Sequence, residues 1–255
     1  MNVVNYYGLS INTTLDKTTQ FFAGMECEIE SLVTNKDIGA FTCTEDGSLR
    51  NHGYEYISQP LTRPELIEEF IALHQKLKFY DKADAFSPRT STHVHINCRS
   101  LDFDTIRNLI LMYAVYEEVF FAMVNRDRRE NIHCVPLTET LLNQRYKASL
   151  EYLVSGWHKY TALNILPLAK LGTVEFRHLQ GTNDAELVAE WLQVLENIWV
   201  YSQVVQITPE FLCDKVQIHA LFGRLFGHSR RIMGIEAGLD QLIARSVIDV
   251  KFGLS

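Results

Sequence analysis

Four short segments of this 255-residue chain alternate apolar and polar side chains with a period of two, the pattern of strands that bury one face. They cover residues 22–32, 54–59, 92–98 and 173–179. Single helices do not separate them at regular intervals, as they would in a parallel βαβ array. The pattern therefore predicts an α+β fold, with a mainly antiparallel curved sheet and helices on one of its faces.

The polar faces of these segments have an unusual composition. Successive side chains of a strand point to opposite faces, so the polar residues of each segment share one face. A face that is merely solvated carries mixed polar residues, whereas strands are depleted in Glu and neighbouring carboxylates repel one another. The four polar faces carry Glu26, Glu28, Glu30, Glu55, His93, His95, Asn97, Glu175 and Arg177.

Carboxylates at this spacing favour a site for divalent metal ions. Alternate side chains on a strand lie about 6–7 Å apart, and two carboxylates can each hold one of two cations separated by about 3.5–4 Å. Oxygen ligands suit Mg²⁺ or Mn²⁺, and Mn²⁺ tolerates a neighbouring imidazole. Arg177 adds a planar guanidinium that can bind a phosphate or a carboxylate through two hydrogen bonds. Such cations would let a chain with a formal charge of −7 hold a polyanionic nucleotide.

The rest of the sequence argues against several other classes of protein. The negative net charge and the lack of a dense Lys/Arg block disfavour nucleic acid as a general partner. No GxxxxGK[ST] loop is present, which excludes a P-loop nucleotide site. The most apolar helical run, residues 109–124, contains Glu117 and Glu118, so no membrane span is expected. Scattered cysteines without a CxxC pair are typical of a reducing compartment, and we expect a cytoplasmic protein.

No linker, low-complexity tract or internal repeat divides the chain. We therefore expect a single domain over residues 1–255, with a helical C-terminal part from about residue 185. Pro64 occupies a favoured first-turn position, and Asn183 and Asp184 are candidate N-caps. Helices are predicted over residues 64–79, 101–125, 185–205, 209–226 and 229–245.

Short motifs follow one another in a particular order along the alternating segments. They are Gly24-Met25-Glu26-Cys27-Glu28, Asp46-Gly47-Ser48-Leu49, Glu55-Tyr56-Ile57-Ser58-Gln59-Pro60, His93-Val94-His95, and Thr173-Val174-Glu175-Phe176-Arg177 with Gly181-Thr182. This order, over residues 24–182, resembles the amidoligase family. Those enzymes are carboxylate–amine ligases, and their catalytic domain is similar to that of glutamine synthetase and glutamate–cysteine ligase.

The resemblance implies an ATP-dependent carbon–nitrogen ligase that joins a carboxylate to an amine, as an amide or isopeptide bond, through an acyl phosphate. The implied cofactors are ATP and Mg²⁺ or Mn²⁺, and the implied substrates are small-molecule or peptide acids and amines. Residue by residue, the implied metal ligands are Glu26, Glu28, Glu55, His93 and Glu175. His95 would meet the nucleotide phosphates, and Asn164 would face the substrate. Arg177 and Glu55 would be catalytic, with Arg177 facing the transferred phosphoryl group. One departure is that Ser91-Thr92 precedes His93 where relatives commonly carry glycine.

Two other interpretations stay open from the residues alone. A metal-dependent hydrolase also uses His-x-His with carboxylates, and a non-catalytic binding protein could retain the same fold. A cupin would need a Glu soon after the histidine pair, and none occurs between His95 and Glu117; an amidohydrolase would need a full β/α barrel. Residues 127–130 are expected to form a solvated turn, although Arg128 or Arg145 could reach a substrate. The identity of the substrates and the oligomeric state are left open.

Overall fold

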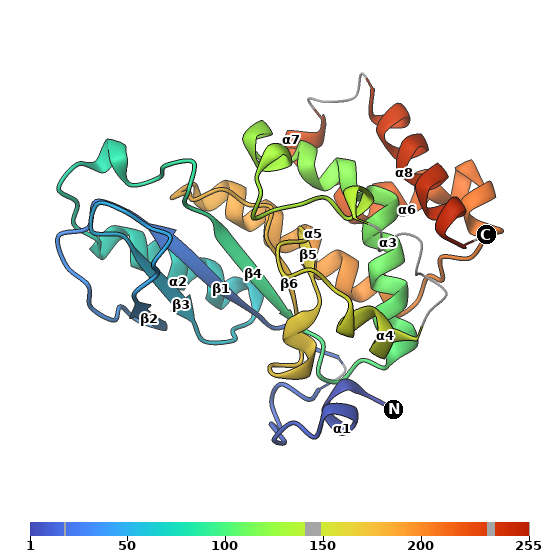
Figure 1. Ribbon diagram of the computed structural model, residues 1–255, viewed down its shortest axis with the longest axis horizontal. Coiled ribbons are helices and arrows are strands. Elements are labelled where there is room, and N and C mark those ends of the chain that lie inside the picture. Colours follow the sequence, from blue (N-terminus) through green and yellow to red (C-terminus); the bar gives the residue numbers. More distant parts are fainter. Residues whose placement is uncertain (18, 141–148, 234–237, 255) are drawn as a thin grey trace.

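A computed structural model describes residues 1–17, 19–140, 149–233 and 238–254 of the protein (Figure 1). Its sheet has six strands in the order β2-β3-β1-β4-β6-β5, and every neighbouring pair is antiparallel. The strands are β1 (Ala23–Ile29), β2 (Phe41–Thr44), β3 (Tyr54–Ser58), β4 (Thr92–Asn97), β5 (Leu163–Asn164) and β6 (Thr173–Phe176). The sheet is open, and the predicted α+β class with an antiparallel sheet is confirmed.

The four strands predicted from alternation lie next to one another at the centre of the sheet, as β3-β1-β4-β6. The two edge strands, β2 and β5, were not predicted. They have four and two residues, which is too short for a period of two to stand out. The register places Glu28 opposite Glu55, Glu26 opposite His93, and Glu175 opposite both His95 and Asn164.

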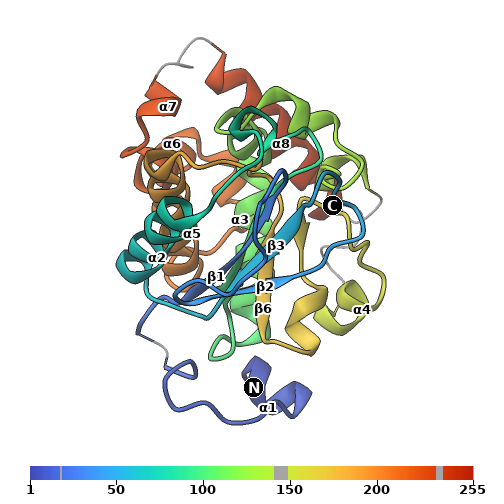
Figure 2. The ribbon, with the colours of Figure 1, turned by 90° about the vertical axis from the view of Figure 1, so that its left-hand side faces the viewer.

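Helices cover the apolar face of the sheet. Met25, Val94 and Phe176 point to this face and are almost fully buried. They belong to one continuous apolar core with the inner sides of α2 (Arg63–Lys76), α3 (Phe103–Ala122) and α5 (Ala185–Ser202). Figure 2 shows α2 and α5 side by side on one side of the strands. The opposite, polar face is therefore the one left to carry a site.

Capping side chains begin these helices, and one of them, Asp184, is an N-cap that the sequence predicted. The Glu65 carboxylate accepts a hydrogen bond of 3.0 Å from the backbone N–H of Thr62, the N-cap of α2. Asp184 caps α5 by accepting hydrogen bonds from the backbone of Glu186 and Leu187. The predicted helix over residues 101–125 is α3, which begins after the N-cap Asp102. Local capping chemistry thus accounts for where each helix starts.

The C-terminal helices differ from the prediction. The single helix predicted over residues 209–226 is a 3₁₀ turn, η6 (Phe211–Cys213), followed by α6 (Lys215–Phe226). Asp214 divides them, because its carboxylate accepts hydrogen bonds from the backbone N–H groups of Val216 and Gln217 and so starts a new helix. The helix predicted over residues 229–245 is α7 (Arg230–Met233) and, as a separate helix, α8 (Leu239–Leu254).

The remaining elements are short. They are α1 (Val3–Tyr7), α4 (Leu150–Ser155), and the 3₁₀ turns η1 (Lys82–Asp84), η2 (Arg126–Glu130), η3 (Leu137–Glu139) and η5 (Leu166–Ala169). Within the described ranges, no helix combines the length and apolar character that a bilayer crossing requires. The expected single-domain organisation stays a prediction.

Candidate active site

Three neighbouring strands bring together a first cluster of potential metal ligands. Glu26 on β1, His93 on β4 and Glu175 on β6 each offer one ligand atom, and these atoms lie within 4.8 Å of one another. The His93 Nδ1 atom lies 3.4 Å from Glu26 Oε2 and 3.4 Å from Glu175 Oε1. The side chains of His93 and Glu175 are buried, so the cluster forms part of the folded interior of the polar face.

A second cluster, made only of carboxylates, lies beside the first. It consists of Glu28 on β1, Glu55 on β3 and Asp46 from the loop after β2, again with ligand atoms within 4.8 Å of one another. Glu28 and Glu55 are direct cross-strand neighbours. Asp46 belongs to the Asp46-Gly47-Ser48-Leu49 motif but was not predicted as a ligand. The local sequence of a loop does not determine which side chains its residues will contact.

Glu30, the third glutamate of the predicted polar face, follows the last residue of β1 and belongs to neither cluster. Its carboxylate accepts a hydrogen bond of 2.7 Å from the backbone N–H of Arg50 and lies 3.6 Å from the Arg89 guanidinium. The bond to Arg50 fixes the end of the loop that carries Asp46. Glu30 thus acts on the site through the loop rather than as a candidate ligand.

Ser91 connects the two clusters. Its backbone N–H and its hydroxyl both donate to Glu28 Oε2, at 2.8 and 2.7 Å. The same hydroxyl lies 2.8 Å from His93 Nε2. A hydroxyl has a single hydrogen, which goes to the carboxylate, so the Ser91 oxygen accepts from Nε2–H and the proton of the neutral imidazole lies on Nε2.

This tautomer leaves the lone pair of His93 Nδ1 facing two carboxylate oxygens. Three acceptors pointing at one another are favourable only with a proton or a cation between them. A neutral imidazole whose other N–H is held by a polar partner is the usual arrangement of a histidine that ligates metal. The donor set of the first cluster therefore fits a divalent cation, and Ser91 supplies the outer contact.

The charges of the two clusters are compensated to different degrees. Burial opposes the ionisation of Glu26, but a proton shared with His93 Nδ1, in the place that a cation would take, and the adjacent His95 outweigh burial and hold the pKa of Glu26 well below its usual range. Burial, followed by repulsion from Glu26, Glu28 and Asp46, raises the pKa of Glu55 to about 7. The second cluster is thus short of positive charge, which a bound cation would supply.

Arg177 and Asn164 both bind Glu175. The Arg177 Nη1 atom donates to Glu175 Oε1, and its Nε atom donates to the carbonyl oxygen of His133 at 2.9 Å. The Asn164 amide donates to Glu175 Oε2 at 2.7 Å. Asn164, expected on the substrate side, is buried and turned toward Glu175, so in this structure it orients a candidate ligand.

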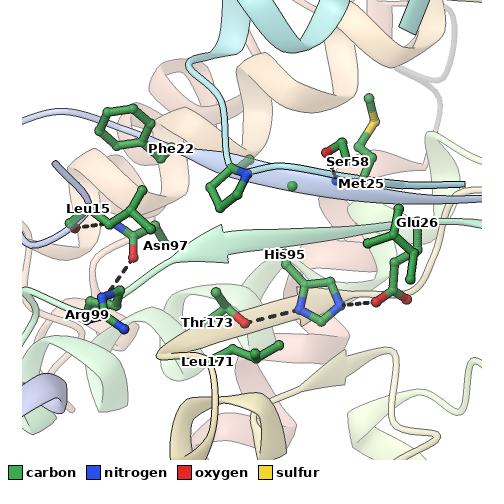
Figure 3. A pocket seen from close by; sticks show the side chains of 14 residues that line it. Leu15, Phe22, Met25, Glu26, Ser58, His95, Asn97, Arg99, Leu171 and Thr173 are labelled. Carbon is green, nitrogen blue, oxygen red and sulfur yellow. Dashed lines mark hydrogen bonds and ion pairs between the residues drawn. The ribbon is translucent and has the colours of Figure 1, made fainter. Parts of the chain in front are cut away.

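His95 lies between the first cluster and an apolar cavity of about 330 Å³. Figure 3 shows its ring between Thr173 and Glu26: Nδ1 is 3.1 Å from Thr173 Oγ1, and Nε2 is 3.1 Å from Glu26 Oε1. Burial would lower the pKa of His95, but the Glu26 carboxylate outweighs burial and raises it. The cavity wall includes Leu15, Phe22, Met25, Ile57, Pro60 and Leu171. Apolar walls with a few polar groups at one end are typical of a small-molecule site.

A larger cavity of about 630 Å³, the basic cavity, opens on the second cluster. Glu28, Asp46 and Ser91 form part of its wall, and so does Arg177. Its other charged residues are Arg89, Arg128, Glu130 and Lys159. The two cavities share no lining residue, and each includes a residue of a different ligand cluster.

Residues 127–130 form the predicted turn, with Asp127 and Glu130 exposed, but Arg128 is not solvated. They lie in η2 (Arg126–Glu130), where the Arg128 side chain is buried. Its Nε atom donates to the His178 carbonyl oxygen at 2.9 Å, and its Nη2 atom donates to the Arg177 carbonyl oxygen at 2.7 Å. These two bonds attach the turn to the end of β6, which is a long-range contact that the local sequence does not reveal. Arg145 lies outside the described residues.

Fold and site together define an α+β protein with two carboxylate-rich ligand clusters on one sheet face and a cavity beside each. The sequence profile of the family described as "Putative amidoligase enzyme" matches residues 8–199, a range that contains all six strands and both clusters. The chain therefore belongs to the amidoligase family. No curated protein matches it.

Proposed function

We propose that the protein is an ATP-dependent carboxylate–amine ligase that forms an amide or isopeptide bond through an acyl phosphate. The observation that carries this proposal is the pair of three-residue ligand clusters beside Arg177, with a separate cavity next to each. Phosphorylating an acid with a nucleotide requires cations between the two reactants and a space for each. Family membership gives the ligase class; the mechanism and the cofactors are our proposal.

Glu26, His93 and Glu175 would hold one divalent cation, and Glu28, Asp46 and Glu55 a second. Five carboxylates with one imidazole fit Mg²⁺ or Mn²⁺ better than a softer metal. Bound cations would neutralise phosphate oxygens and orient them for in-line displacement. The pKa of about 7 at Glu55 supports this assignment, because burial raises it first and repulsion from neighbouring carboxylates, with no compensating charge, raises it further.

The apolar cavity beside His95 is our candidate for the nucleoside of ATP, with His95 at the phosphate end. Arg177 would stabilise the charge of the phosphoryl group in transfer, since such catalysis depends mainly on positioning and electrostatics. Glu175 and the His133 carbonyl hold two edges of the Arg177 guanidinium and so fix its direction. The acid substrate is then assigned to the basic cavity, whose wall includes Arg177.

The proposed reaction has two displacements. A carboxylate oxygen of the acid attacks the terminal phosphorus of ATP, the bond to the bridging oxygen breaks, and ADP leaves. The amine then attacks the acyl carbon, the carbon–oxygen bond to phosphate breaks, and inorganic phosphate leaves with the surplus proton of the amine. The first step converts a poor electrophile into one with a good leaving group.

The test is incubation with Mg²⁺, ATP and pooled acids and amines, with ADP, phosphate and product mass followed together. We expect phosphate release to require the cation and an acid–amine pair, and each phosphate to accompany one dehydrated product. Phosphate release at the same rate without any acid or amine would instead favour a hydrolase. A protein that binds the nucleotide but releases no ADP with any pool would favour a non-catalytic binding protein.

Replacing Arg177 by lysine tests its role in that assay. Lysine keeps the charge but cannot form the two-pronged contact with a phosphoryl group. We expect Arg177→Lys to retain the fold and lose about 100-fold or more in kcat, the scale of losing one transition-state donor. The matched control, Arg230→Lys, alters an exposed ion pair with Glu186 and should leave kcat unchanged. Equal kcat for Arg177→Lys and the parent would assign Arg177 to a structural ion pair.

A cytoplasmic location is part of the proposal. All five cysteines are unpaired thiols, and three of them are buried. Free thiols persist in a reducing compartment, where ATP is also available.

A further inference from the structure

Arg128 is a buried cation without a counter-ion. Its side chain is only 2% exposed, and its two hydrogen bonds go to the carbonyl oxygens of Arg177 and His178. Carbonyl oxygens satisfy N–H groups but carry no net charge. Among the described residues, no carboxylate lies within ion-pairing distance of Arg128. A buried charge of this kind is costly unless something compensates it.

Arg128 lines the basic cavity, and other cations share that wall. Lys159 is exposed, with its ammonium 4.6 Å from the centre of the Tyr160 ring, and no described carboxylate pairs with it. Arg89 is 3.6 Å from Glu30 and more than half exposed. The carboxylates of the wall are engaged or open to solvent: Glu28 and Asp46 belong to the second ligand cluster, and Glu130 is exposed. Arg128 and Lys159 are therefore two cations of this wall that no described carboxylate neutralises.

We propose that the basic cavity selects an acid substrate that carries a second anionic group, either a carboxylate or a phosphate-like group. One carboxylate of the acid would lie at the end formed by Glu28, Asp46 and Arg177, where it is activated. The second group would be held by Arg128 and Lys159 and would fix the orientation of the acid. This inference rests on the proposed function, because it identifies the class of acid for the same site.

The probes are dicarboxylates of increasing length, succinate, glutarate and adipate, each paired with its monoamide, which has the same shape and one charge less. A phosphonate, 3-phosphonopropionate, tests the phosphate-like alternative. Dissociation constants are measured with Mg²⁺ and without ATP. At the preferred length we expect the dianion to bind about tenfold or more tightly than its monoamide, as for a charged hydrogen bond to a buried cation.

Two variants locate the selectivity. Arg128→Gln should bring the ratio of the two dissociation constants close to one, and Lys159→Gln should lower it by about threefold, as expected for a more exposed charge. Lys251→Gln removes an exposed lysine from α8 and should leave the ratio unchanged. Arg128→Gln also loses contacts to β6, so Lys159→Gln, which alters no buried contact, provides a test that does not depend on the folding of the first variant.

Equal binding of dianions and monoamides by the parent protein would overturn the proposal, and so would a ratio that Lys159→Gln leaves unchanged. A weaker affinity of Arg128→Gln for a non-hydrolysable ATP analogue, with the acid ratio intact, would assign the site to nucleotide phosphate and also overturn it. Failure of the proposed ligase function can be told apart from failure of this inference. If the protein binds dianions selectively but forms no amide, the ligase function fails and this inference stands. ADP formation that monoamides support equally well would overturn the inference and leave the ligase standing.

Discussion

The carboxylates of the polar face are not equivalent once their partners are known. Glu26 has two imidazoles beside it, Glu175 has Arg177, and Glu28 accepts two hydrogen bonds from Ser91. Glu55 differs from them: burial, followed by repulsion from the neighbouring carboxylates, raises its pKa to about 7. The metal-free protein should therefore show a pH-dependent stability that Glu55 causes.

The raised pKa of Glu55 gives a pH-dependent stability. The unfolded chain loses this proton near the ordinary glutamate value of 4.5, whereas the folded, metal-free protein keeps it to about pH 7. Between these values the folded state binds more protons, so its stability falls as pH rises. Glu55→Gln removes this effect. In the presence of chelator, the melting temperature of Glu55→Gln minus that of the parent should therefore become larger as the pH is raised from 5 to 7.5. A difference that does not change with pH would contradict the assignment; Glu68→Gln, an exposed site on α2, is the charge control.

Ser91 contacts both clusters, and its replacement should weaken metal binding. Ser91→Ala removes the hydroxyl that contacts Glu28 Oε2 and His93 Nε2 but keeps the backbone bond to Glu28. Loss of an outer contact of this kind weakens metal binding by about 10–100-fold. Titration with Mn²⁺, followed by calorimetry or electron paramagnetic resonance, measures the effect. An unchanged dissociation constant would limit Ser91 to packing, and Ser155→Ala, which alters an exposed hydroxyl on α4, is the matched control.

At the scale of elements, the segment before β4 and the segment after β6 approach each other closely at Gly181. Gly181 donates its backbone N–H to the Thr90 carbonyl oxygen at 2.9 Å, next to the bridge between Ser91 and Gln180. A Cβ atom on Gly181 would lie 2.2 Å from Thr90 Oγ1 and 2.7 Å from Thr90 Cβ. The Gly-Thr motif therefore has a structural reason: the chain leaving β6 must pass close to the segment that positions Ser91.

Gly181→Ala should force these segments apart. Overpacking at such a site costs about 1–3 kcal/mol, and moving Ser91 should also weaken Mn²⁺ binding. Urea unfolding and metal titration of the same protein measure both effects. In Gly223→Ala, on α6, the new Cβ meets no atom within 4 Å, and alanine should stabilise the helix by up to about 1 kcal/mol. If Gly181→Ala has the parent's stability and metal affinity, the close approach does not constrain the site.

At the scale of the whole molecule, both ligand clusters and both cavities depend on the packed sheet, so cation binding should be coupled to folding. A ligand that binds only the folded state stabilises it by about 2.7 kcal/mol at 100 times its dissociation constant. We expect Mg²⁺ or Mn²⁺ with a non-hydrolysable ATP analogue to raise the melting temperature, and chelation to reverse the rise. Glu26→Gln should gain much less, because it removes a ligand of the first cluster.

The control for this coupling is Glu186→Gln, at an exposed position on α5, which should respond to the ligands as the parent does. If Glu26→Gln gains as much stability as the parent, Glu26 is not a metal ligand and the first cluster loses its assignment. If the melting temperature of the parent does not change at millimolar cation and nucleotide, neither cluster is a metal site.

The sequence alone was sufficient to identify the four central strands and the residues that share their polar face. The reason is local: side chains alternate along any strand, so the parity of Glu26, Glu28, His93, His95 and Glu175 is set by the chain itself. Capping residues such as Asp184 act within a few positions and were predictable for the same reason.

Only the tertiary structure decided which of these polar groups are compensated and which distant residues join them. Asp46 reaches the second cluster on a loop, Ser91 bridges Glu28 and His93, and Arg128 is buried against the end of β6. The edge strands β2 and β5 are likewise too short to show a period of their own. Such features depend on strand order and on contacts between residues far apart in the chain, and these follow from the packing of the whole core rather than from any local pattern.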